Sequence, residues 1–101
     1  MEVHYKDNKL KKRCTDEREM QKWRPDLKKK LKLRIKALQA AIAVGDLPED
    51  DPGGDWHMLS GPRDGIWAGE LSGNWRLLVQ PSPLKSLSAV EVTVIDIEDY
   101  H

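Results

Sequence analysis

The chain has 101 residues, of which 39% are hydrophobic and 34% are charged, and its 17 Lys and Arg residues balance its 17 Asp and Glu residues. This length corresponds to one domain, and four Trp residues together with a C-terminal third rich in Val, Ile and Leu exclude a disordered chain. No run of about 18 apolar residues occurs, which excludes a membrane-spanning helix, and the N-terminal segment has no apolar stretch, so that we expect no secretory signal.

The first part of the chain predicts a strand followed by a helix. Residues 2–6 alternate in character and include Val and Tyr, which favours a short first strand. Asp7 or Asn8 can cap a helix over residues 9–22. A break in this helix is expected near Thr15–Asp16.

A longer second helix is predicted over residues 25–44. Pro25 suits the first turn of a helix because it has no N–H group to leave unsatisfied there. Gly45 stands where a C-terminal glycine is expected, and Pro48 follows it. Apolar residues between these signals recur at steps of four, four, three and four and form one stripe: Leu27, Leu31, Ile35, Leu38 and Ile42.

The remaining residues predict a loop and then a sheet. Residues 46–55 are turn-formers and acids, after which the hydrophobic period changes to two. Ser72-Gly73 marks a tight hairpin. The predicted strands are 56–60, 66–71, 74–80 and 89–97. The order of elements predicts an α+β fold, with a short N-terminal strand and two helices packed on one face of a mostly antiparallel sheet.

The charges are divided between the two halves of the chain. Residues 1–45 carry 14 Lys and Arg against 6 Asp and Glu, and residues 46–101 carry 3 against 11. The densest part of the basic half contains no acid: Lys28, Lys29, Lys30, Lys32, Arg34 and Lys36. A solvated helix face usually includes Glu for pairing at i,i+4, so we predict a contact with nucleic acid here. The alternative is a charged face in water.

The predicted strand over residues 74–80 places an arginine on the open face of the sheet. Trp75, Leu77 and Val79 share one face and are expected to lie under the helices. Arg76 then points the other way. An arginine in a central strand is costly unless it meets an anion, so it either binds a substrate anion or pairs with a neighbouring carboxylate.

The given sequence closes on three polar side chains that follow an apolar strand. Ile95 and Ile97 share a face with Asp99, and Tyr100 and His101 come next. A frayed terminus is the alternative reading. We expect the strand to hold this triplet in place.

Acid/base groups and cations together favour cleavage of RNA without a metal. The single Cys14 and the three histidines show no metal-ligand spacing, and one cysteine excludes a disulfide framework and fits the reducing cytoplasm, where we expect the protein. In RNA the 2′-hydroxyl is an internal nucleophile that needs a base, an acid for the leaving oxygen and cations for the phosphate. The candidate residues are His57, Arg63, Arg76, Tyr100 and His101.

Several motifs, taken in order, resemble one family. They are Tyr5-Lys6 in the first strand, L-x-A-A before Asp46-Leu47, His57-x-Leu59-x-Gly61, Gly65-x-Trp67, Asn74-Trp75-Arg76-Leu77 and Asp99-Tyr100-His101. The chain resembles the HigB-type (host inhibition of growth, or plasmid killer) toxins of the RelE/ParE superfamily.

This resemblance implies a RelE-like fold and a metal-independent mRNA interferase that cuts messenger RNA in the ribosomal A site. It also implies a HigA-like helix-turn-helix antitoxin as partner, with operator DNA reached only through that antitoxin, and neither a cofactor nor a membrane. The residues that match catalytic positions are His57, Arg76, Asp99, Tyr100 and His101. Arg63 matches a basic position, and we expect Lys28, Lys29, Lys30 and Lys32 to contact ribosomal RNA. The histidines would share the acid/base work, Arg76 would hold the phosphate, Asp99 would orient a neighbouring group and Tyr100 would position the RNA.

Two other functions remain open on the same fold. A ParE-like toxin would inhibit DNA gyrase by binding and would not need His57 or the closing Asp-Tyr-His. A binding module with a decayed site would have lost its Arg and His residues. The loop over residues 49–55 departs from the pattern because it is rich in Asp, and we expect it to face the antitoxin or solvent.

Overall fold

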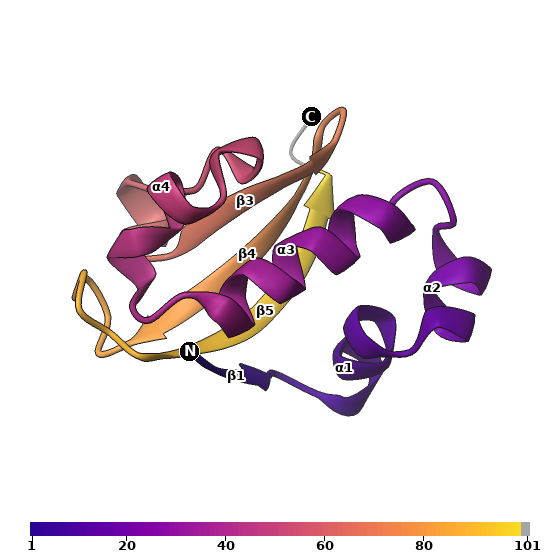
Figure 1. The fold of residues 1–101 in the computed structure, drawn as a ribbon, viewed down its shortest axis with the longest axis horizontal. Coiled ribbons are helices and arrows are strands. Elements are labelled where there is room, and N and C mark those ends of the chain that lie inside the picture. Colours follow the sequence, from indigo (N-terminus) through magenta and orange to yellow (C-terminus); the bar gives the residue numbers. More distant parts are fainter. Residues whose placement is uncertain (100–101) are drawn as a thin grey trace.

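The structure, a computed structural model, describes residues 1–99. In this part of the chain, four α-helices and three short 3-10 turns accompany one five-stranded sheet (Figure 1). The helices are α1 (Asn8–Thr15), α2 (Glu17–Trp23), α3 (Lys28–Ala40) and α4 (Leu47–Asp50), and the 3-10 turns are η1 (Val44–Asp46), η2 (Pro52–Gly54) and η3 (Gly61–Arg63). The strands are β1 (Glu2–Tyr5), β2 (His57–Met58), β3 (Trp67–Ser72), β4 (Trp75–Ser82) and β5 (Glu91–Asp99). The α+β class is as predicted, but the expectation of two helices was wrong.

The sheet has the strand order β1-β5-β4-β3-β2. Strands β2 to β5 form the predicted antiparallel meander, whereas β1 pairs in parallel with β5. The first strand ends at Tyr5, one residue earlier than expected. Strand β2 is shorter than the predicted 56–60 because Trp56 turns into the core, where its indole N–H donates to Asp51 at 2.9 Å.

The predicted break in the first helix is real. Asp7 caps α1 by accepting the N–H of Leu10 at 2.8 Å, and Asp16 both ends α1 and caps α2 by accepting the N–H of Arg18 at 2.9 Å. Aspartate is a favoured N-cap because its carboxylate satisfies N–H groups that have no partner in the first turn. The chain therefore changes direction twice within a short distance.

Helix α3 is shorter than predicted at both ends. The chain leaves the helix after Ala40, and the N–H groups of Val44 and Gly45 donate to the carbonyls of Ala89 and Leu87 instead of continuing the helix. As a result Ile42, which was expected on the apolar stripe, is 80% exposed. Pairing with the loop before β5 ended the helix earlier than Gly45 had indicated.

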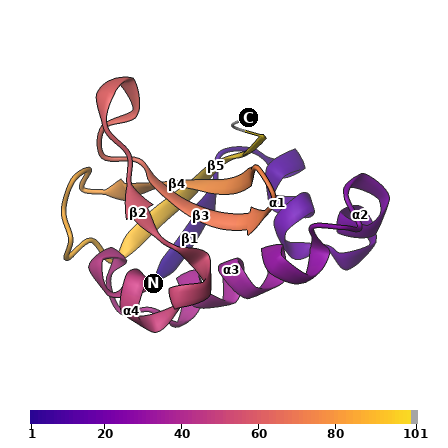
Figure 2. The same cartoon turned by 90° about the horizontal axis from the view of Figure 1, so that it is seen from above.

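The core lies between α3 and one face of the sheet. The four other residues of the predicted stripe, namely Leu27, Leu31, Ile35 and Leu38, are all at most 5% exposed, and Leu77, Val79, Val92 and Val94 meet them from the sheet. Burial of each such side chain contributes about 1.5–3 kcal/mol. Figure 2 shows α3 and α4 along one side of the sheet, and the loop between β2 and β3 extends toward the other side. Within residues 1–99, no helix has both the length and the apolar character that a membrane crossing needs.

Candidate functional site

Two arginines meet one carboxylate on the face of the sheet away from α3. Arg76 alternates with the buried Leu77 in β4 and therefore points to the face away from α3, as predicted, although Leu78 on this same face is buried. Its cross-strand partner in β5 is Glu98. Arg63 reaches the same carboxylate from η3, which lies in the loop between β2 and β3.

Within the described residues, Arg63 and Arg76 both contact the same oxygen of Glu98. Glu98 Oε2 accepts from Arg63 Nη1 at 2.5 Å and from Arg76 Nε at 2.9 Å, and Arg76 Nη2 lies 2.9 Å away. The side chains of Glu98 and Arg76 are 13% and 17% exposed, whereas that of Arg63 is 46% exposed. The hydrogen bond from Arg63, followed by that from Arg76, lowers the pKa of Glu98 against the opposing effect of burial. The cluster is a partly shielded site with two further acids near it, because Glu70 pairs with Arg76 across β3 and β4 and Asp96 attracts Arg63 electrostatically.

Glu98 is a site residue that the sequence analysis missed. It alternates with Ile97 in β5 and so shares a face with Arg76 once the register of β4 and β5 is known. The alternation of Glu98 with apolar residues in β5 could have identified it, since an acidic residue in an apolar strand needs a partner as much as an arginine does.

His57 lies on the same face as Arg76, at the edge strand β2. His57 pairs with Ala68, and Ala68 pairs with Leu78, which follows Arg76 by two residues. Two strand spacings separate β2 from β4, or roughly 10 Å. The exposed imidazole has its Nδ1 at 2.8 Å from the carbonyl oxygen of Asp55. A carbonyl oxygen can only accept a hydrogen bond, so this contact places a proton on Nδ1 and leaves Nε2 as the other ring nitrogen.

Asp99 lies on the opposite face of the sheet from Arg76. It pairs with Trp75 in β4, and Trp75 alternates with Arg76. Arg24 stacks over the Trp75 ring at 4.4 Å. The hydrogen bond from Arg24 to Asp26 raises the pKa of Arg24, and a smaller electrostatic attraction to Asp99 acts in the same direction. The structure thus brings Arg63 and Arg76 together and places Asp99 with Arg24. Tyr100 and His101 lie outside the described residues.

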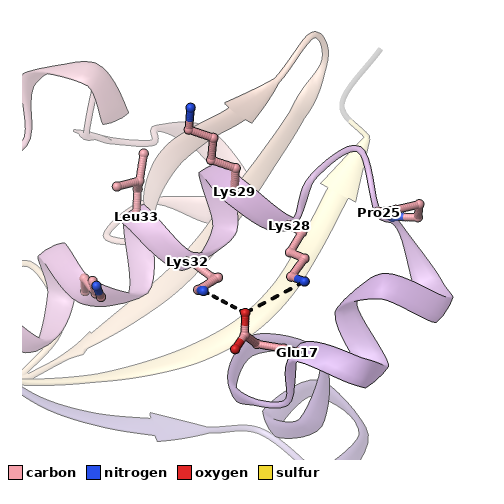
Figure 3. A pocket seen from close by; sticks show the side chains of 7 residues that line it. Glu17, Pro25, Lys28, Lys29, Lys32 and Leu33 are labelled. Atoms are coloured by element: carbon pink, nitrogen blue, oxygen red, sulfur yellow. Dashed lines mark hydrogen bonds and ion pairs between the residues drawn. The ribbon is translucent and has the colours of Figure 1, made fainter.

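The predicted lysine surface lines a hollow of about 420 Å³ on α3 (Figure 3). Its lining residues are Glu17, Pro25, Lys28, Lys29, Lys32, Leu33 and Lys36. Glu17 at the start of α2 lies 2.7 Å from Lys32 Nζ and 3.8 Å from Lys28 Nζ, and the hydrogen bond from Lys32 lowers the pKa of Glu17. The basic run of α3 contains no acidic residue, and Glu17 of α2 provides the carboxylate that pairs with its lysines. In Figure 3 Lys29 points away from Glu17, and both Lys29 and Lys30 are exposed.

Arg34 does not belong to the charged face, although it lies within the basic run. It is 3% exposed and binds the acidic loop: Nη1 donates to both carboxylate oxygens of Asp51 at 3.0 and 3.1 Å, and Nη2 donates to the carbonyl of Gly53 at 2.8 Å. Its Nε donates to the carbonyl of Glu70 in β3 at 2.7 Å. The expectation that the acidic loop faces only solvent or a partner was therefore wrong for Asp51.

One group of side chains has the residue types of a metal site. Glu2 and His4 of β1 and Glu91 of β5 each offer a ligand atom, and these atoms lie within 4.8 Å of one another. Glu91 is remote from the other two in sequence, so no spacing could reveal the group. His4 Nε2 lies 3.3 Å from Glu2 and 3.5 Å from Glu91, and the three side chains are between 44% and 63% exposed, which is equally typical of surface ion pairs.

Comparisons with known proteins show the fold. No protein-family model matches the chain, and no curated protein matches it. A solved YoeB/ParE toxin from Agrobacterium tumefaciens is similar over 100% of both chains, with a TM-score of 0.60 and 15% sequence identity. The chain therefore shares the fold of this YoeB/ParE toxin, in agreement with the RelE-like fold that its motifs predicted, and the likeness shows the fold alone.

Proposed function

We propose that the protein is a toxin of a type II toxin–antitoxin module, of the HigB type, and that it cleaves messenger RNA on the ribosome without a metal. The fold of the YoeB/ParE toxin supports the first part of this proposal. The observation that carries the second is the convergence of Arg63 and Arg76 on the open sheet face, which they share with His57. Two guanidinium groups on the same sheet face as a base suit the transfer of a phosphoryl group within RNA.

The proposed reaction uses the groups on this face together with His101. His57 Nε2 takes the proton of the ribose 2′-hydroxyl, whose oxygen attacks the adjacent phosphorus. Arg76 and Arg63 stabilise the additional negative charge on the phosphate oxygens. The bond to the 5′-oxygen breaks and that oxygen takes a proton, which leaves a 2′,3′-cyclic phosphate and a 5′-hydroxyl end. The proton comes from His101 in this proposal, because His57 is already used as the base.

Glu98 is poorly suited to serve as the base instead. Its two arginine partners lower its pKa, and a carboxylate that holds protons so weakly is a poor acceptor near neutral pH. Tyr100 would stack on the RNA and Asp99 would orient a neighbouring group. The exposed Lys29 and Lys30, together with Lys28 and Lys32, would contact ribosomal RNA, and an antitoxin of the HigA type would neutralise the protein.

The test is cleavage of messenger RNA on programmed ribosomes by purified protein that has been treated with EDTA and separated from it beforehand. His57→Gln should lower the single-turnover rate by roughly 10²–10⁴, the range for loss of a general base. His4→Gln is the matched control, because His4 is also exposed but lies in β1 at the opposite edge of the sheet. Equal rates for the two variants would contradict the assignment. Inhibition of DNA gyrase without any cleavage would favour the ParE-like alternative.

A further inference from the structure

We infer that Glu98 occupies, in the free protein, the place that a phosphate of the RNA takes between Arg63 and Arg76, and that the RNA displaces it from Arg63. This inference rests on the proposed function for the identity of the ligand. Glu98 would then compete with the RNA phosphate for the two arginines. In the free protein it fills the anion site and holds both arginines in place.

The geometry of the cluster is that of a guanidinium site for an oxyanion. One oxygen, Glu98 Oε2, receives Arg63 Nη1 at 2.5 Å and Arg76 Nε at 2.9 Å. Carboxylate and phosphate oxygens are both recognised by the fork of N–H groups that arginine presents. An oxyanion of the substrate would therefore compete with Glu98 for the same donors.

The two arginines are unequally anchored. Arg76 comes from the middle of the sheet, is 17% exposed and faces Glu98 across the β4–β5 ladder with two of its nitrogens. Arg63 comes from η3 in a loop, and its side chain is 46% exposed. Asp64, the next residue, is engaged by Lys85. Arg63 is thus the donor that can transfer from Glu98 to an incoming phosphate, while Arg76 keeps Glu98 on the sheet.

Binding of inorganic phosphate, followed through the arginine Nε–Hε signals in NMR spectra, tests this inference without any cleavage step. Glu98→Gln keeps the shape of the side chain but removes the competing charge, so phosphate affinity should rise by at least about tenfold, as expected when strong charge-assisted hydrogen bonds become available to a new anion. Adding Arg63→Gln to this variant should abolish the gain.

Asp96→Asn is the matched control. Asp96 lies on the same strand and face as Glu98, two residues earlier, and attracts Arg63 only electrostatically. Its own Oδ1 accepts the N–H of Ile97 at 2.8 Å, a bond that Asn retains. Asp96→Asn removes one negative charge, as Glu98→Gln does, but it should change phosphate affinity by less than about twofold, since partly exposed charges interact weakly through water.

Two results would overturn the inference: no gain in affinity for Glu98→Gln, or an equal gain for Asp96→Asn. Glu98→Ala provides a second variant that should show the same gain, and thermal unfolding of each variant establishes that it is folded. A protein that binds phosphate as expected but leaves messenger RNA intact would refute the proposed function and leave the anion site standing. Cleavage of messenger RNA by a protein whose phosphate affinity does not rise with Glu98→Gln would support the proposed function and refute the inference about Glu98.

Discussion

Replacement of Asp51 by Ala tests whether Arg34 is a structural residue or part of the basic surface. Asp51 accepts two hydrogen bonds from Arg34 and one from the indole of Trp56. Arg34 is 3% exposed, so its charge would remain buried after the substitution. Removal of one partner from a buried ion pair costs about 3–5 kcal/mol. Arg34 keeps its bonds to two carbonyl groups, which favours the lower end of this range, or about 3 kcal/mol.

Urea denaturation followed by tryptophan fluorescence measures this loss. The exposed neighbour Asp50 is the control, and Asp50→Ala should change the free energy of unfolding by no more than about 0.5 kcal/mol. The double variant Arg34→Met/Asp51→Ala should recover part of the stability because no buried charge remains. A loss below about 1 kcal/mol for Asp51→Ala would mean that Arg34 is not a buried structural charge but part of the solvated face.

Three further predictions concern the candidate site and the buried thiol. His101→Gln should lower the single-turnover rate of RNA cleavage by roughly 10²–10⁴ while the melting temperature stays near that of the parent, and an unchanged rate would remove His101 from the mechanism. Glu17→Gln frees two lysines and should steepen the salt dependence of ribosome binding, whereas Lys29→Glu with Lys30→Glu should flatten it; unchanged slopes would mean that the lysines only face water. Burial raises the pKa of the Cys14 thiol from 9.0 to about 12, so the unfolded chain releases this proton first and stability should fall as pH rises above about 9. Urea denaturation between pH of about 8 and about 11 should show a smaller loss for Cys14→Ala than for the parent, and equal losses would contradict the assignment.

Local patterns predicted the elements whose formation depends on nearby residues. The apolar stripe of α3, the cap at Asp7 and the break at Asp16 each rest on residues within a few positions of one another. The alternation in β4 likewise placed Arg76 on the open face. The meander followed from the order of strands joined by short turns.

Contacts between segments distant in sequence determine the features that local patterns did not predict. The end of α3 depends on pairing of Val44 and Gly45 with residues near position 88, and no local stop signal marks Ala40. Arg34 looks like its lysine neighbours in sequence, and only the fold shows that it meets Asp51. The register of β4 and β5 decides that Glu98 joins Arg76 and that Asp99 joins Trp75 on the other face. A single-residue change of register would exchange these two roles.

Mapping of messenger RNA 5′ ends after expression of the chain is the decisive test of the proposed RNA cleavage. We expect new 5′-hydroxyl ends within translated regions, together with growth arrest that a co-expressed antitoxin relieves. With Arg76→Ala these ends should fall by roughly 10²–10³, the effect of removing one group that stabilises transition-state charge. Growth arrest with intact messenger RNA and inhibited gyrase would contradict the account, as would the same set of ends from the parent and from Arg76→Ala.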